Sequence, residues 1–146
     1  MNRNIVVSTK EKDLKRSWHI VDVKGKILGR IASEIAVKLM GKGKPNFVRH
    51  LDMGDHVVVV NSKDVKVTGK KEKTKLYGRY SGYPGGLKQK ALWQLRQENP
   101  NEIIRHAVWG MLPVNKLRSR LMRRLYIFPD ENHPYENKIE KKDMKQ

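Results

Sequence analysis

Residues 69–86, which we expect to form a loop, combine closely spaced cations with tyrosines and glycines. Lysine and arginine neutralise phosphate groups and release counterions, while tyrosine rings stack on unpaired bases. The alternative is a solvated lysine loop whose tyrosines fold back onto the core. Because the whole chain is strongly basic, we favour nucleic-acid binding, with one of the three tyrosines serving the core. The candidate binding residues of this segment are Lys70, Lys71, Lys73, Lys75, Arg79, Tyr80 and Tyr83.

A second basic segment, residues 115–126, has the periodicity of a helix with one apolar and one cationic face. Leu117, Leu121 and Leu125 recur at four-residue steps and predict the buried stripe. Like charges on the other face repel each other unless an anion compensates them, and the segment holds no acidic residue. A solvated face would more usually mix lysine with glutamate, whereas the planar arginine group suits bidentate phosphate contact. The candidate binding residues here are Lys116, Arg118, Arg120, Arg123 and Arg124.

A basic turn follows a predicted helix over residues 27–40. Gly41 is placed to end that helix, and Pro45 prevents its continuation. A lysine in this position also compensates the helix dipole, and that role is compatible with phosphate binding. The candidate binding residues of the turn are Lys42, Lys44 and Arg49.

Patterns for catalysis or metal binding are weak. The turn at residues 25–29 lacks the glycine spacing of a dinucleotide or phosphate loop, so an enzyme acting on a phosphorylated ligand is the weaker alternative. Asp52, Asp55 and His56 have no accompanying metal motif and fit ordinary turn chemistry. The chain contains no cysteine, which excludes thiolate catalysis and Cys-based zinc sites. We therefore expect no catalytic residue, metal, cofactor or small-molecule substrate.

The 146 residues carry 32 Lys and Arg against 15 Asp and Glu, a net charge of +17. The excess is +8 in residues 1–50, +5 in residues 51–100 and +4 in residues 101–146, so the folded surface itself must be basic. Such a surface predicts a polyanionic partner. No apolar run approaches the roughly 20 residues of a membrane span, and the N-terminus lacks a signal peptide, so we expect a cytoplasmic protein without a membrane partner. A duplex-DNA regulator is disfavoured because no helix-turn-helix is recognisable.

The elements that must position these segments alternate between strand and helix. The patterns predict an α/β domain over residues 18–129 with helices flanking a small, mostly parallel sheet. We expect residues 1–17 to be an N-terminal arm and residues 130–146 to be a charged tail. Trp18, Trp93 and Trp109 lie on predicted apolar faces and are expected in the core. Besides the helices at 27–40 and 115–126, we expect strands at 18–23, 55–61, 64–69 and 125–128, a helix from residue 87, and a helix from Pro100 to Met111 capped by Asn99.

Several blocks occur in a characteristic order between Trp18 and about Pro134. They include Leu28-Gly29-Arg30-Ile31-Ala32, Gly54-Asp55, Val67-Thr68-Gly69-Lys70-Lys71, Ser81-Gly82-Tyr83-Pro84-Gly85-Gly86 and Gly110-Met111-Leu112-Pro113. With this order, length and charge, the chain resembles the bacterial large-subunit ribosomal protein L-thirteen family. It departs from that family after His133-Pro134, where Tyr135 stands in place of a second histidine.

The resemblance implies a three-layer α/β domain whose four-stranded, largely parallel sheet lies between helices. It also implies a non-enzymatic constituent of the large ribosomal subunit. Such a protein binds large-subunit rRNA, helps to organise it during subunit assembly and lies beside neighbouring large-subunit proteins. We accordingly expect a protein located in the ribosome rather than a stand-alone homo-oligomer.

Overall fold

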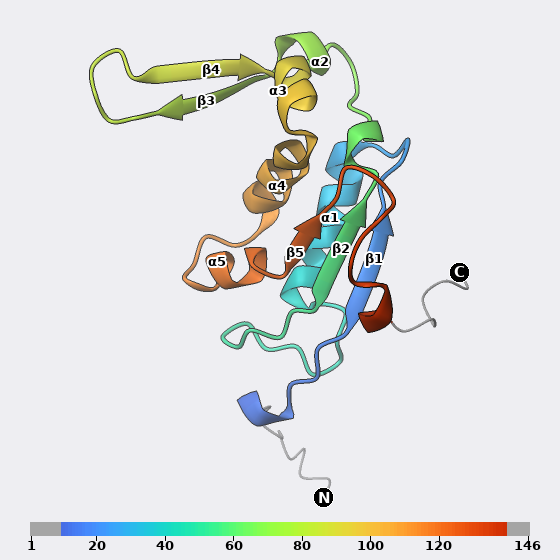
Figure 1. Ribbon diagram of the computed structural model, residues 1–146. Helices are drawn as coiled ribbons and strands as arrows, with labels where there is room; N and C mark the ends of the chain where they lie inside the picture. Colours follow the sequence, from blue (N-terminus) through green and yellow to red (C-terminus); the bar gives the residue numbers. More distant parts are fainter. Residues whose placement is uncertain (1–9, 140–146) are drawn as a thin grey trace, which may run out of the picture.

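The computed structural model describes residues 10–139, and its centre is a three-stranded parallel sheet (Figure 1). Strand β1 (Trp18–Asp22) pairs with β2 (His56–Val60), which pairs in turn with β5 (Leu125–Ile127). Residues 57–60 form a continuous β-branched run, which is typical of a strand with two buried faces, and all four valines are buried. The strands expected at 18–23, 55–61 and 125–128 are therefore confirmed to within a residue or so at each end.

Helix α1 (Leu28–Met40) connects β1 to β2 and packs on one face of the sheet (Figure 1). It ends at Gly41, whose φ is 77° and whose N–H donates to the carbonyl of Val37. Glycine adopts this left-handed conformation without strain, and a Cβ here would also collide with the backbone carbonyl of Met53. The expected helix and its cap are confirmed, and residues 41–55 turn back closely against the end of α1.

The two faces of the sheet are covered differently. Helix α4 (Pro100–Met111) packs beside α1. The buried side chains of both helices form the hydrophobic core with one face of the sheet. The opposite face carries the C-terminal segment (Figure 1). There the ring of Tyr135 lies 5.2 Å from that of Trp18 and 4.6 Å from that of Tyr126. Apart from the 3-10 turn η3 (Glu136–Lys138), this layer is not helical. The expectation of helices on both faces is thus corrected, since a coil segment forms the third layer.

The expected fourth strand of the sheet is also corrected. Within residues 10–139 the sheet has three strands, and residues 64–69 contribute only a single parallel bridge, between Ile27 and Lys66. The Leu28 N–H donates to the Lys66 carbonyl at 2.8 Å, and the Lys66 N–H donates to the Lys26 carbonyl at 2.9 Å. This segment, which follows the 3-10 turn η2 (Ser62–Asp64), therefore pairs with the turn before α1.

Residues 69–91 differ most from expectation. In place of one long loop followed by a helix from residue 87, the chain forms helix α2 (Lys71–Thr74) and an antiparallel hairpin of β3 (Leu76–Tyr80) and β4 (Leu87–Ala91). The hairpin extends away from the body of the molecule (Figure 1). The spacing of Leu87 and Ala91 fits a helix, but the glycine-rich turn brings this segment back along β3, where the strand ladder satisfies its backbone groups.

The remaining helices connect the hairpin to β5. Helix α3 (Leu92–Glu98) precedes α4, which begins at Pro100 as expected, although the Asn99 side chain makes no capping hydrogen bond. Helix α5 (Leu117–Met122) is shorter than the expected 115–126 because its last residues belong to β5. The 3-10 turn η1 (Glu11–Asp13) lies in the N-terminal arm. None of the helices within residues 10–139 is long and apolar enough to cross a membrane.

Candidate nucleic-acid interface

The β3–β4 hairpin has two chemically different faces. Side chains directly opposite each other in an antiparallel pair lie on the same face. Arg79 therefore shares one face with Lys88, while Tyr80 shares the other with Leu87. All four residues are exposed. Lys88 is absent from the candidate residues predicted from the sequence, because residues 87–91 were expected to begin a helix. The signal that could have found it is the placement of lysine at every second position, Lys88 and Lys90, which is the period of a strand.

The three tyrosines divide as the sequence analysis expected, with one in the core. Tyr80 and Tyr83 are 65% and 76% exposed, so their rings are accessible for stacking. Tyr77 is half-buried and meets the ring of His106 edge to face at a centroid distance of 5.2 Å. Burial raises the pKa of Tyr77 above its usual value, which is typical of a core phenol.

The lysines on and around α2 extend the cationic surface from the base of the hairpin. Lys70, Lys71, Lys73 and Lys75 are all exposed, and Lys75 Nζ lies 5.3 Å from the centre of the Tyr77 ring. The acidic residue among them does not neutralise them, since Glu72 accepts two hydrogen bonds from Arg96, at 2.8 and 3.0 Å. Because Arg96 also donates to the carbonyl of Val65 at 2.8 Å, this pair anchors α2 to the body.

The basic residues of the α5 segment do not share one face. Lys116, Arg120 and Arg123 are exposed and have no acidic partner within residues 10–139. Arg118 is half-buried; its guanidinium lies 4.1 Å from the centre of the Trp109 ring, and its Nε donates to the Trp109 carbonyl at 3.0 Å. Trp109, expected in the core, is instead 41% exposed and supports this arginine. Trp93 is likewise 44% exposed, and half-buried Trp18 packs under the C-terminal segment.

Arg124 departs most clearly from the expected cationic face, because it is buried. Its guanidinium donates two hydrogen bonds to the carboxylate of Asp52, and the one from Nη1 measures 2.7 Å. This bidentate geometry is characteristic of strong arginine–carboxylate pairs. Burial would raise the pKa of Asp52, but the hydrogen bond and charge of Arg124 outweigh it and hold that pKa below its usual value. Arg124 therefore joins β5 to the 41–55 segment and is unavailable to a phosphate.

Lys44 has the same internal role in the 41–55 segment. Its Nζ lies 2.6 Å from a carboxylate oxygen of Asp55 and donates to the Met53 carbonyl at 2.8 Å. The other oxygen of Asp55 lies 2.9 Å from His19 Nε2, and the Ser17 N–H donates to the carboxylate at 3.0 Å. Burial would raise the pKa of Asp55, but these hydrogen bonds outweigh it and lower that pKa from 3.8 to about 2. Lys42 and Arg49, by contrast, are exposed and have no ion pair within residues 10–139.

The neighbouring His56 is also part of the framework. Its ring stacks on that of Trp18 at 4.3 Å, and burial, together with the charges of Arg124 and Arg16, lowers its pKa. No group of acidic or histidine residues able to hold a metal ion is found in the described part of the chain. Asp52, Asp55 and His56 therefore have structural roles at the end of the 41–55 segment.

The chain is similar in sequence to known proteins over most of its length. A family profile described as "Ribosomal protein L13" matches residues 16–134. A relative from Caldanaerobacter subterraneus, named "Large ribosomal subunit protein uL13", is 48% identical over 92% of this chain and 95% of its own length. A relative of the same name from Solibacter usitatus is 47% identical over 84% of this chain and 85% of its own length.

These matches put the chain among the ribosomal proteins, a structural rather than an enzymatic class. Both the profile and the relatives cover nearly all of the α/β domain. The chain belongs to the ribosomal protein L13 family.

Proposed function

We propose that the protein is a structural component of the large ribosomal subunit in the cytoplasm, where it binds large-subunit rRNA through two basic surfaces. The hairpin surface consists of Lys70, Lys71, Lys73, Lys75, Arg79, Tyr80, Tyr83 and Lys88. The α5 surface consists of Lys42, Arg49, Lys116, Arg120 and Arg123, with Arg118 at its edge on Trp109.

The observation that carries this proposal is the state of these cations. In a member of a ribosomal protein family, these cations are exposed and have no ion pair within residues 10–139, while nearby carboxylates are already engaged. Asp52 and Asp55 hold Arg124 and Lys44, and Glu72 holds Arg96. Exposed like charges repel each other unless an anion approaches them, and closely packed rRNA phosphates supply that anion.

In this mechanism the protein holds separate rRNA segments in a fixed relation. Lysines neutralise phosphates as mobile point charges, and Arg120 and Arg123 can each engage a phosphate through two parallel hydrogen bonds. Tyr80 and Tyr83 offer rings for bases that are not stacked. Because both surfaces belong to one folded chain, binding would organise the rRNA during subunit assembly, beside neighbouring large-subunit proteins.

Charge reversal on the α5 surface tests the proposal. We expect R120E/R123E to keep its thermal unfolding midpoint, because both side chains are exposed, and to bind deproteinised large-subunit rRNA much more weakly than wild type in filter-binding titrations. The matched control is K24E/K26E, which makes the same charge change at an exposed turn outside both surfaces. Equal losses in the two double variants would show that overall charge, and not the α5 surface, determines binding.

A further inference from the structure

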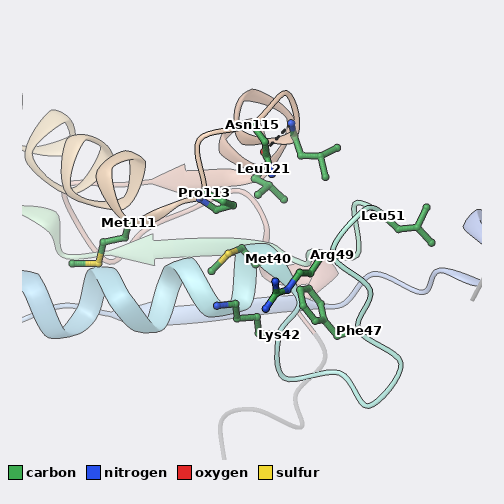
Figure 2. A pocket seen from close by; sticks show the side chains of 10 residues that line it. Met40, Lys42, Phe47, Arg49, Leu51, Met111, Pro113, Asn115 and Leu121 are labelled. Atoms are coloured by element: carbon green, nitrogen blue, oxygen red, sulfur yellow. Dashed lines mark hydrogen bonds between the residues drawn. The ribbon is translucent and has the colours of Figure 1, made fainter.

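A pocket of about 420 Å³ lies where the end of α1, the 41–55 segment and the connection from α4 to α5 meet (Figure 2). This volume is within the range of about 300–1,000 Å³ that is usual for ligand sites. The pocket wall is mostly apolar, and its residues include Met40, Phe47, Met111, Pro113 and Leu121. The pocket therefore offers an apolar surface in the middle of a strongly basic region.

The polar residues that line the pocket are cations and one amide. Figure 2 shows Lys42 and Arg49 at the same end of the pocket as Phe47. No acidic residue lines the pocket, and neither cation has an ion pair within residues 10–139. Asn115 uses its side-chain oxygen to accept a hydrogen bond from the Leu117 N–H at 3.1 Å, which leaves its NH₂ group as a donor. An occupant of matching chemistry has a flat apolar body, polar edges and a negative charge.

We infer that this pocket receives one unstacked nucleotide of the rRNA. The base lies against Phe47, the Asn115 amide donates to its edge, and Lys42 and Arg49 hold the phosphate at the rim. Phenylalanine rings and arginine planes are the surfaces on which proteins stack splayed RNA bases. An apolar side chain of a neighbouring protein would leave the cationic rim unused. The inference rests on the proposed function, because it assigns one nucleotide to the interior of the α5 surface.

Photocrosslinking identifies the occupant directly. Phe47 is replaced by the photoreactive residue p-benzoylphenylalanine, and large subunits assembled with the full-length protein are purified and irradiated. We expect a crosslink to a single rRNA nucleotide, mapped by primer extension. The control carries the same residue at position 114, because Val114 is 88% exposed next to the pocket but does not line it. A crosslink from position 47 to a protein, or none to rRNA, would overturn the inference.

Affinity measurements test the role of the ring. F47A should weaken binding of deproteinised large-subunit rRNA by about 5- to 100-fold, the effect expected of one base–aromatic stack, while F47Y should bind as wild type does. The tyrosine variant keeps the ring, so it separates stacking from any loss of folding in F47A, which thermal unfolding monitors. If F47A binds with wild-type affinity while R120E/R123E does not, the pocket assignment fails and the proposed function stands. If the wild-type protein does not bind the rRNA, both fail.

Discussion

Two adjacent arginines of the same segment lie in opposite environments. Arg123 is exposed and unpaired within the described residues, whereas Arg124 is buried against Asp52. The difference follows from the direction of each side chain at the start of β5, since Arg124 turns toward the 41–55 segment. Residue type alone therefore does not tell a binding arginine from a structural one.

The first prediction separates these two roles. R124A removes the bidentate partner of the partly buried Asp52 carboxylate and leaves it only Arg16, at 3.6 Å. We therefore expect the free energy of unfolding to fall by about 2 kcal/mol in urea denaturation. R123A removes only an exposed side chain and should change it by no more than about 0.5 kcal/mol. In rRNA binding by the folded proteins the order should reverse, with R123A the weaker binder. Equal destabilisation by the two variants would contradict the assignment of Arg124.

The second prediction concerns the pH dependence of stability. The folded pKa of Asp55 is about 2 and its ordinary value is 3.8, so the unfolded chain binds a proton first. The stabilisation, about 2 kcal/mol, is thus present above roughly pH 4 and is lost as the pH falls toward 2. The lowered pKa of His56 acts in the same direction, with a loss that begins as the pH falls below 6.5. Urea midpoints measured from about pH 8 down to about pH 3 should show both decreases.

The control for this prediction is D55N. It keeps the size of the side chain and removes the titrating group, so its stability should be lower at neutral pH and should fall less below about pH 4. Parallel acid curves for D55N and wild type would show that another carboxylate is responsible.

Among the structural elements, the β3–β4 hairpin is held in place mainly by contacts at its base, because its own strands are largely exposed. A two-stranded hairpin alone is at best marginally stable in water. Tyr77, packed toward the core, and the Ala91 N–H, which donates to Gln94 in α3, attach it to the body. Its exposed cations can therefore reach rRNA at a distance from the sheet.

The third prediction uses two lysines of the same strand. Lys88 has no acidic partner within residues 10–139, whereas Lys90 pairs with Glu98. We expect K88A to weaken rRNA binding and to reduce the slope of log affinity against log salt by about 0.7 to 0.9, the loss of one neutralised phosphate. K90A should alter the slope less, because this lysine is already compensated. A larger effect of K90A would indicate that rRNA contacts the hairpin at its base.

At the scale of the whole molecule, a net charge of +17 makes the free protein repel itself. The fourth prediction is that added salt has opposite effects on folding and binding. Thermal unfolding of the free protein should shift to higher temperature as salt rises from about 0.05 to 0.5 M, because screening weakens the repulsion. Over the same range, rRNA affinity should fall, with a slope of about −0.7 to −0.9 per phosphate contacted. A flat binding response would point to attachment through another protein.

Elements with a strong local pattern were predictable from the sequence. The β1–α1–β2 unit and α4 have clear hydrophobic patterns, and Gly41 marks the end of α1 while Pro100 marks the start of α4. Residues 87–91 were not predictable in this way, because Leu87 and Ala91 fit a helix locally. Residues 87–91 form a strand because their backbone groups hydrogen-bond with those of residues 76–80. The third layer was also not predictable from the sequence, since the C-terminal segment has no hydrophobic periodicity of its own.

Net charge and ordered motifs, which need no coordinates, already mark this chain as a basic α/β protein of the L13 family. The sequence also identified most of the exposed cations. Which of these cations lack an acidic partner within residues 10–139 becomes clear from the folded chain. Arg124 meets Asp52 across 72 positions and Lys44 meets Asp55 across the turn, and such pairings depend on distances that folding alone creates. A charge contributes to a binding surface only where the fold provides no partner for it.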